Sequence, residues 1–466
     1  MRFALVIAVA VSACSHPNPP PAPAPSPAPE RAATVPPAKP AAPAPVTFAG
    51  VPETPAGKEL GWVLGTIVHG KGVVTKAELE AKFTPAFLTA VPAEQMVTLF
   101  GQLGEQLAML QLVSVKGDEL HAIAHVTVGP NKLRVTLELD PARRRIAGLL
   151  LRPDGDEGPK PKTFDEAMTM TTALAPRAQL LVASLDKGTC KPLHRAGGKE
   201  PLAIASTVKL YVLLGLVDRI LAGKATWDDE LAVRDDWKSL PSGMTQKDAA
   251  GTKLTLREYA TRMISISDNT ATDHLLYTLG RDKVEAAMRS TKHTNPRLNV
   301  PFISTRELFL FKLGMPADEL DGYRKLDEKK RRAFLDTQLA GKVPDITHAA
   351  NWQKPRRIDE LEWFATSEDL CRAMGTLWQR AQKPKGKDLL DVLAKNPGVP
   401  IDTARWPYVG YKGGSEPGVL NLTWLLQRSD KKWFVVVLTA NAVDGHVEEP
   451  KATAIASGVI ELLGAD

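Results

Sequence analysis

Apolar residues recur at intervals of three and four in the first part of the chain that has a clear pattern. Over 57–67 this spacing predicts a helix with one buried face. The same spacing continues over 76–88 and 94–110, which predicts two more helices. The pattern therefore begins with a helical segment.

The period then changes to two. Three runs alternate between apolar and polar residues, at 110–115, 120–128 and 133–139, and a fourth run at 146–151 closes the meander. Lys116-Gly117-Asp118 and Gly129-Pro130-Asn131 separate the first three runs and favour turns. Helices followed by a curved antiparallel sheet predict a small, cone-like α+β domain over 47–152.

A larger region, 164–466, follows a linker at 153–163. It opens with a strand-like run at 180–185, and from Ser206 it becomes apolar on all sides, which predicts a buried central helix. Three more strand-like runs and a helix end the chain, at 406–412, 419–427, 433–440 and 447–463. Strands from both ends around a helical middle predict one sheet with helices packed against it, an α/β arrangement.

The N-terminus has the pattern of an exported protein. A basic start precedes a short apolar run at 3–11, and small residues lead to Cys14. The run is too short to span a bilayer. The ending resembles a bacterial lipobox, so we expect a lipoprotein signal over 1–14, with Cys14 lipidated. The alternative is an ordinary signal peptide with an incidental cysteine.

Residues 15–46 are rich in Pro and Ala and contain almost no large apolar side chains. Such a stretch cannot offset its ordering entropy by burial, so we expect an extended tether. The signal and tether together predict a lipoprotein anchored to a membrane and facing the periplasm or the cell exterior.

Charge and composition narrow the classes of partner. The formal charge is +6, but the basic residues form no dense cluster, which argues against nucleic-acid binding. A mild positive field favours anionic ligands, although a solvated basic surface is the simpler account. His121 and His125 share a strand face without a further ligand at a suitable spacing, so we expect no metal and no cofactor.

Two cysteines, Cys190 and Cys371, remain in the larger region. In an oxidising compartment they can pair if their Cα atoms lie close enough. The sequence does not give that distance, and we favour two free, buried thiols.

Ser-x-x-Lys strings occur three times, at Ser184/Lys187, Ser206/Lys209 and Ser429/Lys432. The first and third fall in expected hairpin turns. Only Ser206 opens a buried helix, where Lys209 lies one turn further on the same face. Burial lowers the pKa of a lysine, so Lys209 can act as the base that a serine nucleophile needs. The alternative is that Ser206 is a plain helix cap.

Ser267-Asp268-Asn269 is a rarer string and precedes a helical run that contains His274. Ser267 can relay a proton to a leaving atom, and Asn269 can hold Lys209 and a substrate amide. The alternative is that Asp268 or Asn269 only caps the next helix, with His274 in helix packing.

Lys412-Gly413-Gly414-Ser415 ends a predicted strand. Glycine allows a substrate backbone to approach, and the amide of Ser415 can complete an oxyanion hole with that of Ser206. Lys412 supplies a second cation that lowers the pKa of Lys209 and orients an acyl group. A glycine-rich passage from strand to turn is the alternative.

With these three motifs, the chain resembles the penicillin-recognising serine enzymes, and most closely the class A β-lactamases. The resemblance implies an acyl-enzyme on Ser206 and a β-lactamase-like sandwich of antiparallel sheet and helices with an all-helical lobe. The first domain contains Val51-Pro52-Glu53-Thr54-Pro55-Ala56-Gly57 and Leu60-Gly61-Trp62-Val63-Leu64. Through these strings it resembles the steroid-isomerase-like domain of a two-domain group that includes a clavulanic-acid-pathway esterase and β-lactamase-like lipoproteins.

The chain departs from the family pattern in two places. Gly413 stands where a Thr or Ser hydroxyl is usual, although Ser415 can compensate. The loop that carries the deacylating glutamate has no clean match over 299–308. Glu307 is the nearest candidate for that base, but a carboxylate at a helix start beside Arg306 is the favoured interpretation.

These observations predict an exported serine hydrolase that acts on a β-lactam or a small ester or amide, slowly on β-lactams if no deacylating base is in place. The rival hypothesis is a protein that binds β-lactams or cell-wall peptides without hydrolysing them. The expected partners are a small-molecule substrate and the membrane, and the oligomeric state stays open.

Overall fold

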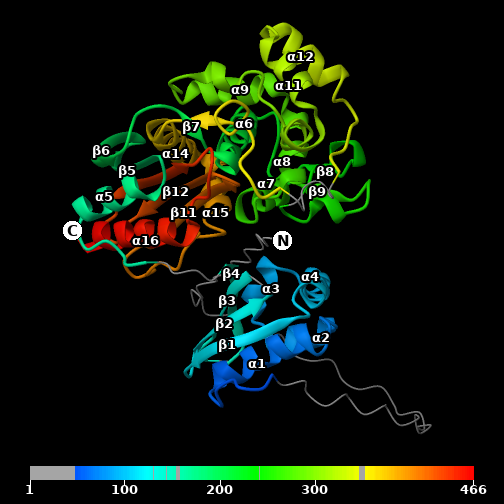
Figure 1. Cartoon of the computed structure of the whole chain (residues 1–466), viewed down its shortest axis with the longest axis vertical. Coiled ribbons are helices and arrows are strands. Elements are labelled where there is room, and N and C mark those ends of the chain that lie inside the picture. The colour runs from blue at the N-terminus through cyan, green and yellow to red at the C-terminus, as the bar shows by residue number, and fades with distance from the viewer. Residues whose placement is uncertain are drawn as a thin grey trace, which may run out of the picture. The chain divides into compact units, whose positions relative to one another are not determined.

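The computed structural model describes residues 48–465, except 130, 143, 154–157, 241 and 346–351. The chain divides into two compact units, with the boundary between Leu150 and Leu151 (Figure 1). The predicted leader 1–14, with Cys14, and the predicted tether 15–46 lie outside the described residues.

The first unit contains four helices followed by a four-stranded sheet. The sheet has the order β1-β2-β3-β4, and α1 packs against its first three strands. The elements are α1 (Pro55–Val68), α2 (Lys76–Lys82), α3 (Pro85–Ala90), α4 (Ala93–Gln106), β1 (Leu110–Gly117), β2 (His121–Val128), β3 (Asn131–Leu139) and β4 (Ile146–Pro153). The meander therefore follows the predicted change from helical to alternating periodicity.

One predicted helix of this unit is two helices. The run 76–88 is interrupted at Phe83, which has an extended backbone and forms a bridge with Ile146. Thr84 then caps α3 through its side chain, and Pro85 occupies the first turn. The residue before a proline is biased away from helical geometry, and proline itself is favoured at a helix start. Apolar spacing alone does not carry that information.

The second unit is built around a five-stranded antiparallel sheet. Its order is β11-β12-β13-β5-β6, so β13 near the C-terminus pairs directly with β5. The strands are β5 (Arg177–Asp186), β6 (Thr189–Ala196), β11 (Tyr408–Glu416), β12 (Val419–Gln427) and β13 (Trp433–Asn441). One sheet formed from both ends of this region was the sequence prediction, and it is confirmed.

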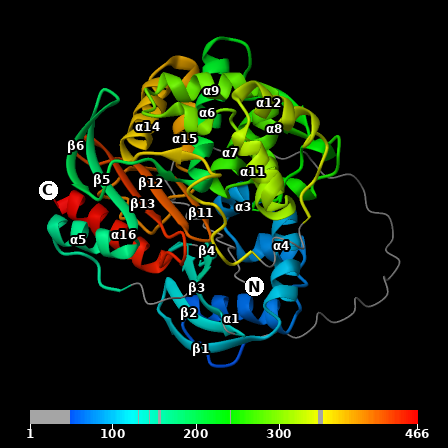
Figure 2. The same ribbon diagram turned by 45° about the horizontal axis from the view of Figure 1, so that its top comes forward.

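Helices cover both faces of this sheet. On one face, α5 (Phe164–Leu174) and α16 (Glu449–Ala465) pack together, as Figure 2 shows. On the other face, α14 (Ser367–Ala381) lies against β5, β6 and β13 and leads into a helical lobe. Each face has its own apolar cluster, with Trp424 in one and Leu425 in the other, because neighbouring strand residues point to opposite sides.

The helical lobe surrounds α6 (Lys209–Leu221). This helix is buried on nearly all sides and packs against α8, α9 and α14, which confirms the predicted central helix. The other helices here are α7 (Leu256–Ser265), α8 (Asn269–Leu279), α9 (Arg281–Ser290), α10 (Thr305–Phe309), α11 (Ala317–Lys325), α12 (Glu328–Thr337) and α15 (Asp388–Leu393). Short strand pairs are β7 (Leu202–Ala203) with β10 (Phe364–Ala365), and β8 (Glu230–Ala232) with β9 (Lys253–Thr255).

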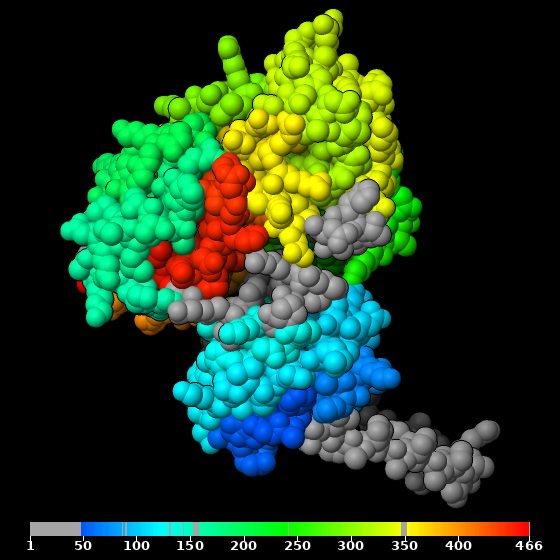
Figure 3. Space-filling model, in the orientation of Figure 1, coloured from blue at the N-terminus to red at the C-terminus, as the bar shows by residue number. Residues whose placement is uncertain are grey.

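The space-filling view shows where the loop after β13 lies on the surface of this unit. The loop, in red, lies beside residues near 355, in yellow (Figure 3). An open hollow in this area is lined by Asp321, Arg324, Arg357 and Asp444, among others. None of the residues that line it belongs to the three motifs.

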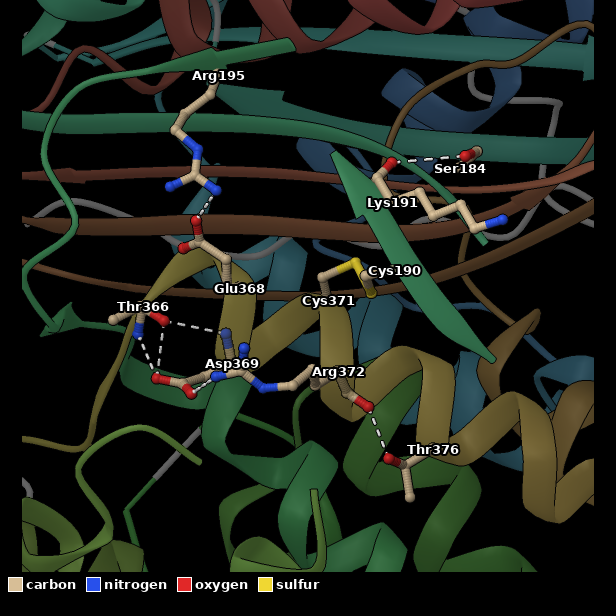
Figure 4. The surroundings of a disulfide bond; sticks show 10 residues. All are labelled: Ser184, Cys190, Lys191, Arg195, Thr366, Glu368, Asp369, Cys371, Arg372 and Thr376. Atoms are coloured by element: carbon tan, nitrogen blue, oxygen red, sulfur yellow. Dashed lines mark hydrogen bonds and ion pairs between the residues drawn. A yellow bond between two sulfur atoms is a disulfide. The ribbon is translucent and has the colours of Figure 1, made fainter. Parts of the chain in front are cut away.

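Cys190 and Cys371 form a disulfide, so the preference for two free thiols was wrong. The bond joins β6 to α14, and Figure 4 shows it close to the ion pair between Arg195 and Glu368. The Cα atoms are 6.3 Å apart, within the range that a disulfide bridges. The two residues are 181 positions apart in the chain, and sequence patterns do not measure such distances.

Candidate active site

Ser206 lies in a tight turn between β7 and the central helix. The turn is the 3-10 segment η1 (Ala205–Val208), and Ala205 has a φ of 44°, in the left-handed region that most side chains avoid. Neither η1 nor α6 has a side-chain cap. The hydroxyl of Ser206 instead lies 3.0 Å from Nζ of Lys209, which contradicts the alternative of a plain helix cap.

The amine of Lys209 lies at the centre of the three motifs. Its Nζ is 3.0 Å from Oγ of Ser267, 2.6 Å from the carbonyl oxygen of Ser267 and 2.7 Å from Oδ1 of Asn269. Oγ of Ser206, at 3.0 Å, is the fourth oxygen neighbour. An ammonium donates three hydrogen bonds, whereas a neutral amine donates two and can accept the hydroxyl proton of Ser206 with its lone pair.

Burial is the main influence on Lys209. It lowers the pKa of this side chain to about 7, against the opposing charges of Asp268 and Asp273, which raise it. A substantial neutral fraction therefore exists at neutral pH, as a general base requires.

Lys412 lies on the other side of Ser267. Its Nζ is 3.1 Å from Oγ of Ser267 and also donates to the carbonyl of Gly413. Burial lowers the pKa of Lys412 well below its usual value, and the nearby Lys209 lowers it further. The hydroxyl of Ser267 thus connects two lysines, and its backbone φ of 56° holds it there.

Asp268 and Asn269 fix the start of α8 in different ways. Asp268 caps the helix by accepting from the amide of Ala271 at 2.8 Å, and it also accepts from the amides of Met244 and Thr245. Asn269 donates to the carbonyl of Leu240 at 3.0 Å while its Oδ1 faces Lys209. The cap expected for this string is present, and so is the contact between Asn269 and Lys209.

The end of β11 approaches the turn that carries Ser206 closely. A Cβ atom on Gly414 would lie 2.3 Å from the carbonyl oxygen of Ile204 and 2.6 Å from the nitrogen of Ser206. Only glycine allows this contact. It brings the next residue, the exposed Ser415, to the edge where Ser206 begins its turn.

The structure explains why residue 413 is glycine and not the usual Thr or Ser, which the sequence did not reveal. A Cβ atom there would lie 2.1 Å from the hydroxyl oxygen of Tyr411. The ring of Tyr411 packs on Trp424, with ring centres 4.8 Å apart, and cannot easily move away. Tyr411 thus occupies the space that a Thr or Ser side chain would need.

Glu307 is held by groups outside the three motifs. It forms a capping box with Ser304 at the start of α10, and its two oxygens face the guanidinium of Arg281 at 2.8 and 2.9 Å. Its side chain is 1% exposed. The carboxylate therefore lies at a helix start, as the favoured interpretation had it, with Arg281 as its ion-pair partner.

Asp273 and His274 follow Asn269 on α8 and lie buried next to the three motifs. Asp273 lies one turn after Asn269, accepts from the amides of Thr305 and Arg306, and has its pKa raised by burial to about 6. His274 is buried between the rings of Trp237 and Tyr259, which agrees with helix packing. The sequence analysis did not single out Asp273. Its position four residues after Asn269, on the same buried face of the helix, could have identified it.

Within the described residues, no group of three or more His, Cys, Asp or Glu side chains is placed to hold a metal ion. His121 is largely exposed and faces Asp118 at 3.6 Å.

Family models match both units of the chain. A model described as the β-lactamase enzyme family matches residues 169–462. A different model, described as the N-terminal part of the ORF 12 gene product, matches residues 51–142. No curated protein matches the chain.

Several solved structures are similar to this chain over about two thirds of its length. A β-lactamase from Sphaerobacter thermophilus DSM 20745 is 22% identical, with a TM-score of 0.46, over 65% of this chain and 98% of that chain. PBP-A is 16% identical, with a TM-score of 0.43, over 66% of this chain and 99% of that chain. A β-lactamase from Chitinophaga pinensis DSM 2588 is 15% identical, with a TM-score of 0.43, over 65% of this chain and 97% of that chain.

Proposed function

This chain belongs to the β-lactamase enzyme family, and from that premise we propose that it is an exported serine hydrolase that forms an acyl-enzyme on Ser206. One observation carries the proposal. The hydroxyl of Ser206 lies 3.0 Å from a buried lysine, Lys209, whose pKa is lowered to about 7. A serine becomes a good nucleophile when a neutral base stands within hydrogen-bond reach.

The proposed acylation moves one proton in a circuit. As Oγ of Ser206 attacks the substrate carbonyl, neutral Lys209 takes its proton. The carbonyl π bond opens to an oxyanion, which the amides of Ser206 and Ser415 stabilise. When the oxyanion collapses, the bond to the leaving nitrogen or oxygen breaks. Ser267 protonates that atom and regains a proton from Lys209, which lies 3.0 Å away.

The proposed substrate is a β-lactam or another small ester or amide. Lys412 and Gly414 border the acyl group, and Asn269 binds its amide. Turnover of β-lactams is expected to be slow for two reasons. Gly413 offers no hydroxyl for a substrate carboxylate, and the carboxylate of Glu307, the candidate deacylation base, is held by Arg281.

The test uses two reactive probes and mass spectrometry. A chromogenic cephalosporin and a p-nitrophenyl ester report turnover, while intact-protein mass spectrometry reports a covalent adduct. We expect an adduct on Ser206 with at least one probe, and its loss in Ser206→Ala. Absence of both adduct and turnover in the wild-type protein would contradict the proposal.

A second function, a sensor that binds β-lactams or cell-wall peptides without hydrolysis, has one observation in its favour. Glu307 is committed to Arg281 and Ser304 and is therefore poorly available to activate a deacylating water. A stable adduct that persists for hours without product release would favour the sensor, and product release at a steady rate would favour the hydrolase.

Export and anchoring are a separate part of the proposal. We propose that Cys14 is lipidated and becomes the first residue of the mature chain. Metabolic labelling with a fatty acid should mark the wild-type protein and leave Cys14→Ser unlabelled. Equal labelling of both would refute the anchor. Along the described residues, the structure has no helix with the length and hydrophobicity needed to cross a bilayer.

A further inference from the structure

Lys312, Glu362 and Glu416 form a buried charged cluster at the end of β11, which we name the carboxylate clamp. Nζ of Lys312 lies 2.6 Å from Oε1 of Glu362 and also contacts Oε1 of Glu416. The side chains of Lys312, Glu362 and Glu416 are 1%, 0% and 5% exposed. Because water is excluded, these groups must pair their charges and hydrogen bonds with one another.

The clamp places two buried carboxyl groups against one buried ammonium, so with both carboxylates ionised it would carry a net negative charge away from water. Such a charge is costly, and the two carboxyl groups therefore hold one shared proton between them. With that proton, Lys312 and the carboxyl pair are together neutral. Burial and the neighbouring Glu362 raise the pKa of Glu416 well above its ordinary value. Arg356 lies beside the clamp and donates to the carbonyl of Lys312 at 2.7 Å.

The clamp joins the two segments that flank the nucleophile turn. Glu362 precedes Trp363, whose carbonyl accepts from the amide of Ile204 at 3.0 Å, two residues before Ser206. Glu416 lies two residues after Gly414, which touches the backbone of Ser206. Alternation along a strand places Glu416 on the same face of β11 as Gly414. Lys312 is therefore the bridge between both sides of this turn.

We propose that the carboxylate clamp positions the Gly414–Ser415 edge of β11 against Ser206, and that loss of the shared proton releases this edge. The inference rests on the proposed function, because the edge that it positions is the proposed acyl-binding edge. The three clamp residues act through β11 and are positioning residues. Deprotonation would leave a net negative charge in a buried place, and repulsion between Glu362 and Glu416 would separate the segments that they hold.

The direction of the pH effect follows from this chemistry. A carboxyl group with a raised pKa in the folded protein favours the fold at low pH, and that contribution is lost as the pH rises through the folded value. Acylation of Ser206 should therefore decline on the alkaline side. This limb is separate from the decline at acidic pH that protonation of Lys209 would cause.

Glu416→Gln tests the shared proton. The amide keeps the size and shape of the carboxyl group but cannot titrate, so we expect the alkaline decline in the rate of acylation by a fluorescent penicillin to move upward by at least about one pH unit. Lys312→Met removes the bridge. We expect it to lower kcat/KM by about 100-fold, the scale of a misplacement of roughly 1 Å.

Glu285→Gln is the matched control. Glu285 is also a buried carboxylate, 2% exposed, and it pairs with Arg332 and accepts from the amide of Phe302. Its substitution should lower stability without moving the alkaline limb. If Glu416→Gln retains the wild-type alkaline limb, or if Glu285→Gln shifts it equally, the clamp proposal is wrong.

Hydrogen exchange gives a readout that needs no activity. After correction for the intrinsic rate, the amides of 412–416 should lose protection in the wild-type protein as the pH rises, while those of β13 should not. Glu416→Gln should keep its protection. If no probe acylates the wild-type protein, the proposed function fails, and exchange still decides the clamp. Protection that is independent of pH in both proteins would overturn it.

Discussion

Lys209 is a single buried side chain in which a stability cost accompanies the proposed role as a base. Burial disfavours its charged form, while Asp268 and Asp273 favour it, and the balance gives a pKa of about 7. The sequence predicted its place beside Ser206, because a spacing of three residues puts two side chains on one helical face. The sequence did not predict the 3-10 turn or the strained Ala205, because both depend on the strands that flank the turn.

The first prediction concerns the pH dependence that Lys209 imposes. Acylation needs the neutral amine, so below about pH 6 the rate should fall by about tenfold per pH unit. A lysine with a lowered pKa in the folded protein contributes stability at high pH that is lost as the pH falls through about 7. Stopped-flow labelling with a fluorescent penicillin measures the rate, and Ser206→Ala gives the background. A rate that stays flat from pH 5 to pH 8 would exclude Lys209 as the base.

The second prediction concerns the loss of stability when a side chain is added at Gly413. Gly413→Ser places a Cβ atom in the space that the Tyr411 hydroxyl fills, so we expect a loss of about 1–3 kcal/mol in the free energy of unfolding, as in other overpacked sites. Urea denaturation measures it. Gly322→Ala in α11 is the matched control, because its Cβ would meet no atom within 4 Å, and it should be neutral or stabilising. Equal stability of Gly413→Ser and wild type would show that Tyr411 moves freely.

At the scale of elements, local rules account for most of the boundaries. Thr54, Thr75 and Asp268 each cap a helix with their side chains, as residues of these types do at helix starts. The expected single helix over 76–88 was wrong because a proline rule outweighed apolar spacing at Pro85. The pairing of Cys190 with Cys371 was missed because β6 and α14 meet only in the folded chain.

The third prediction concerns this disulfide. Because the bond closes a loop between residues 181 positions apart, its removal should destabilise the protein by about 2–5 kcal/mol. The change is Cys190→Ser with Cys371→Ser, and the measurement is the midpoint of thermal unfolding. A reductant should lower the midpoint of the wild-type protein and leave that of the double variant unchanged. No difference between wild-type and variant midpoints would mean that the bond adds nothing to stability.

At the scale of the whole molecule, the candidate site depends on segments that are far apart in the chain. The three motifs belong to η1, the start of α8 and the end of β11, and each motif could be found by its letters. What brings them together is the pairing of β13 with β5, which lets one sheet hold both ends of the region. The sequence pattern predicted that sheet. The contacts that refine the site, such as Tyr411 against Gly413 and Arg281 against Glu307, depend on side-chain packing that no periodicity describes.

The last prediction is that the second unit folds and acts without the first. Its sheet lies between Arg177 and Asn441, and one of its apolar clusters extends from Ala167 to Leu463. A unit with its own sheet and core is expected to fold alone. A chain of residues 158–466 should therefore unfold in one cooperative transition, and Ser206 should be acylated at a rate within about threefold of the full-length rate, since additivity holds for independent parts.

Cooperative unfolding and acylation of Ser206 test different claims, so both are measured. The first unit, expressed alone, serves as the control for folding. Circular dichroism during heating reports whether residues 158–466 and, separately, residues 48–153 melt cooperatively, and a fluorescent penicillin reports acylation of Ser206. A cooperative melt with acylation reduced more than tenfold would mean that the first unit contributes to the site. A second unit that fails to melt cooperatively, beside a first unit that does, would mean that its core is incomplete without the residues before 158.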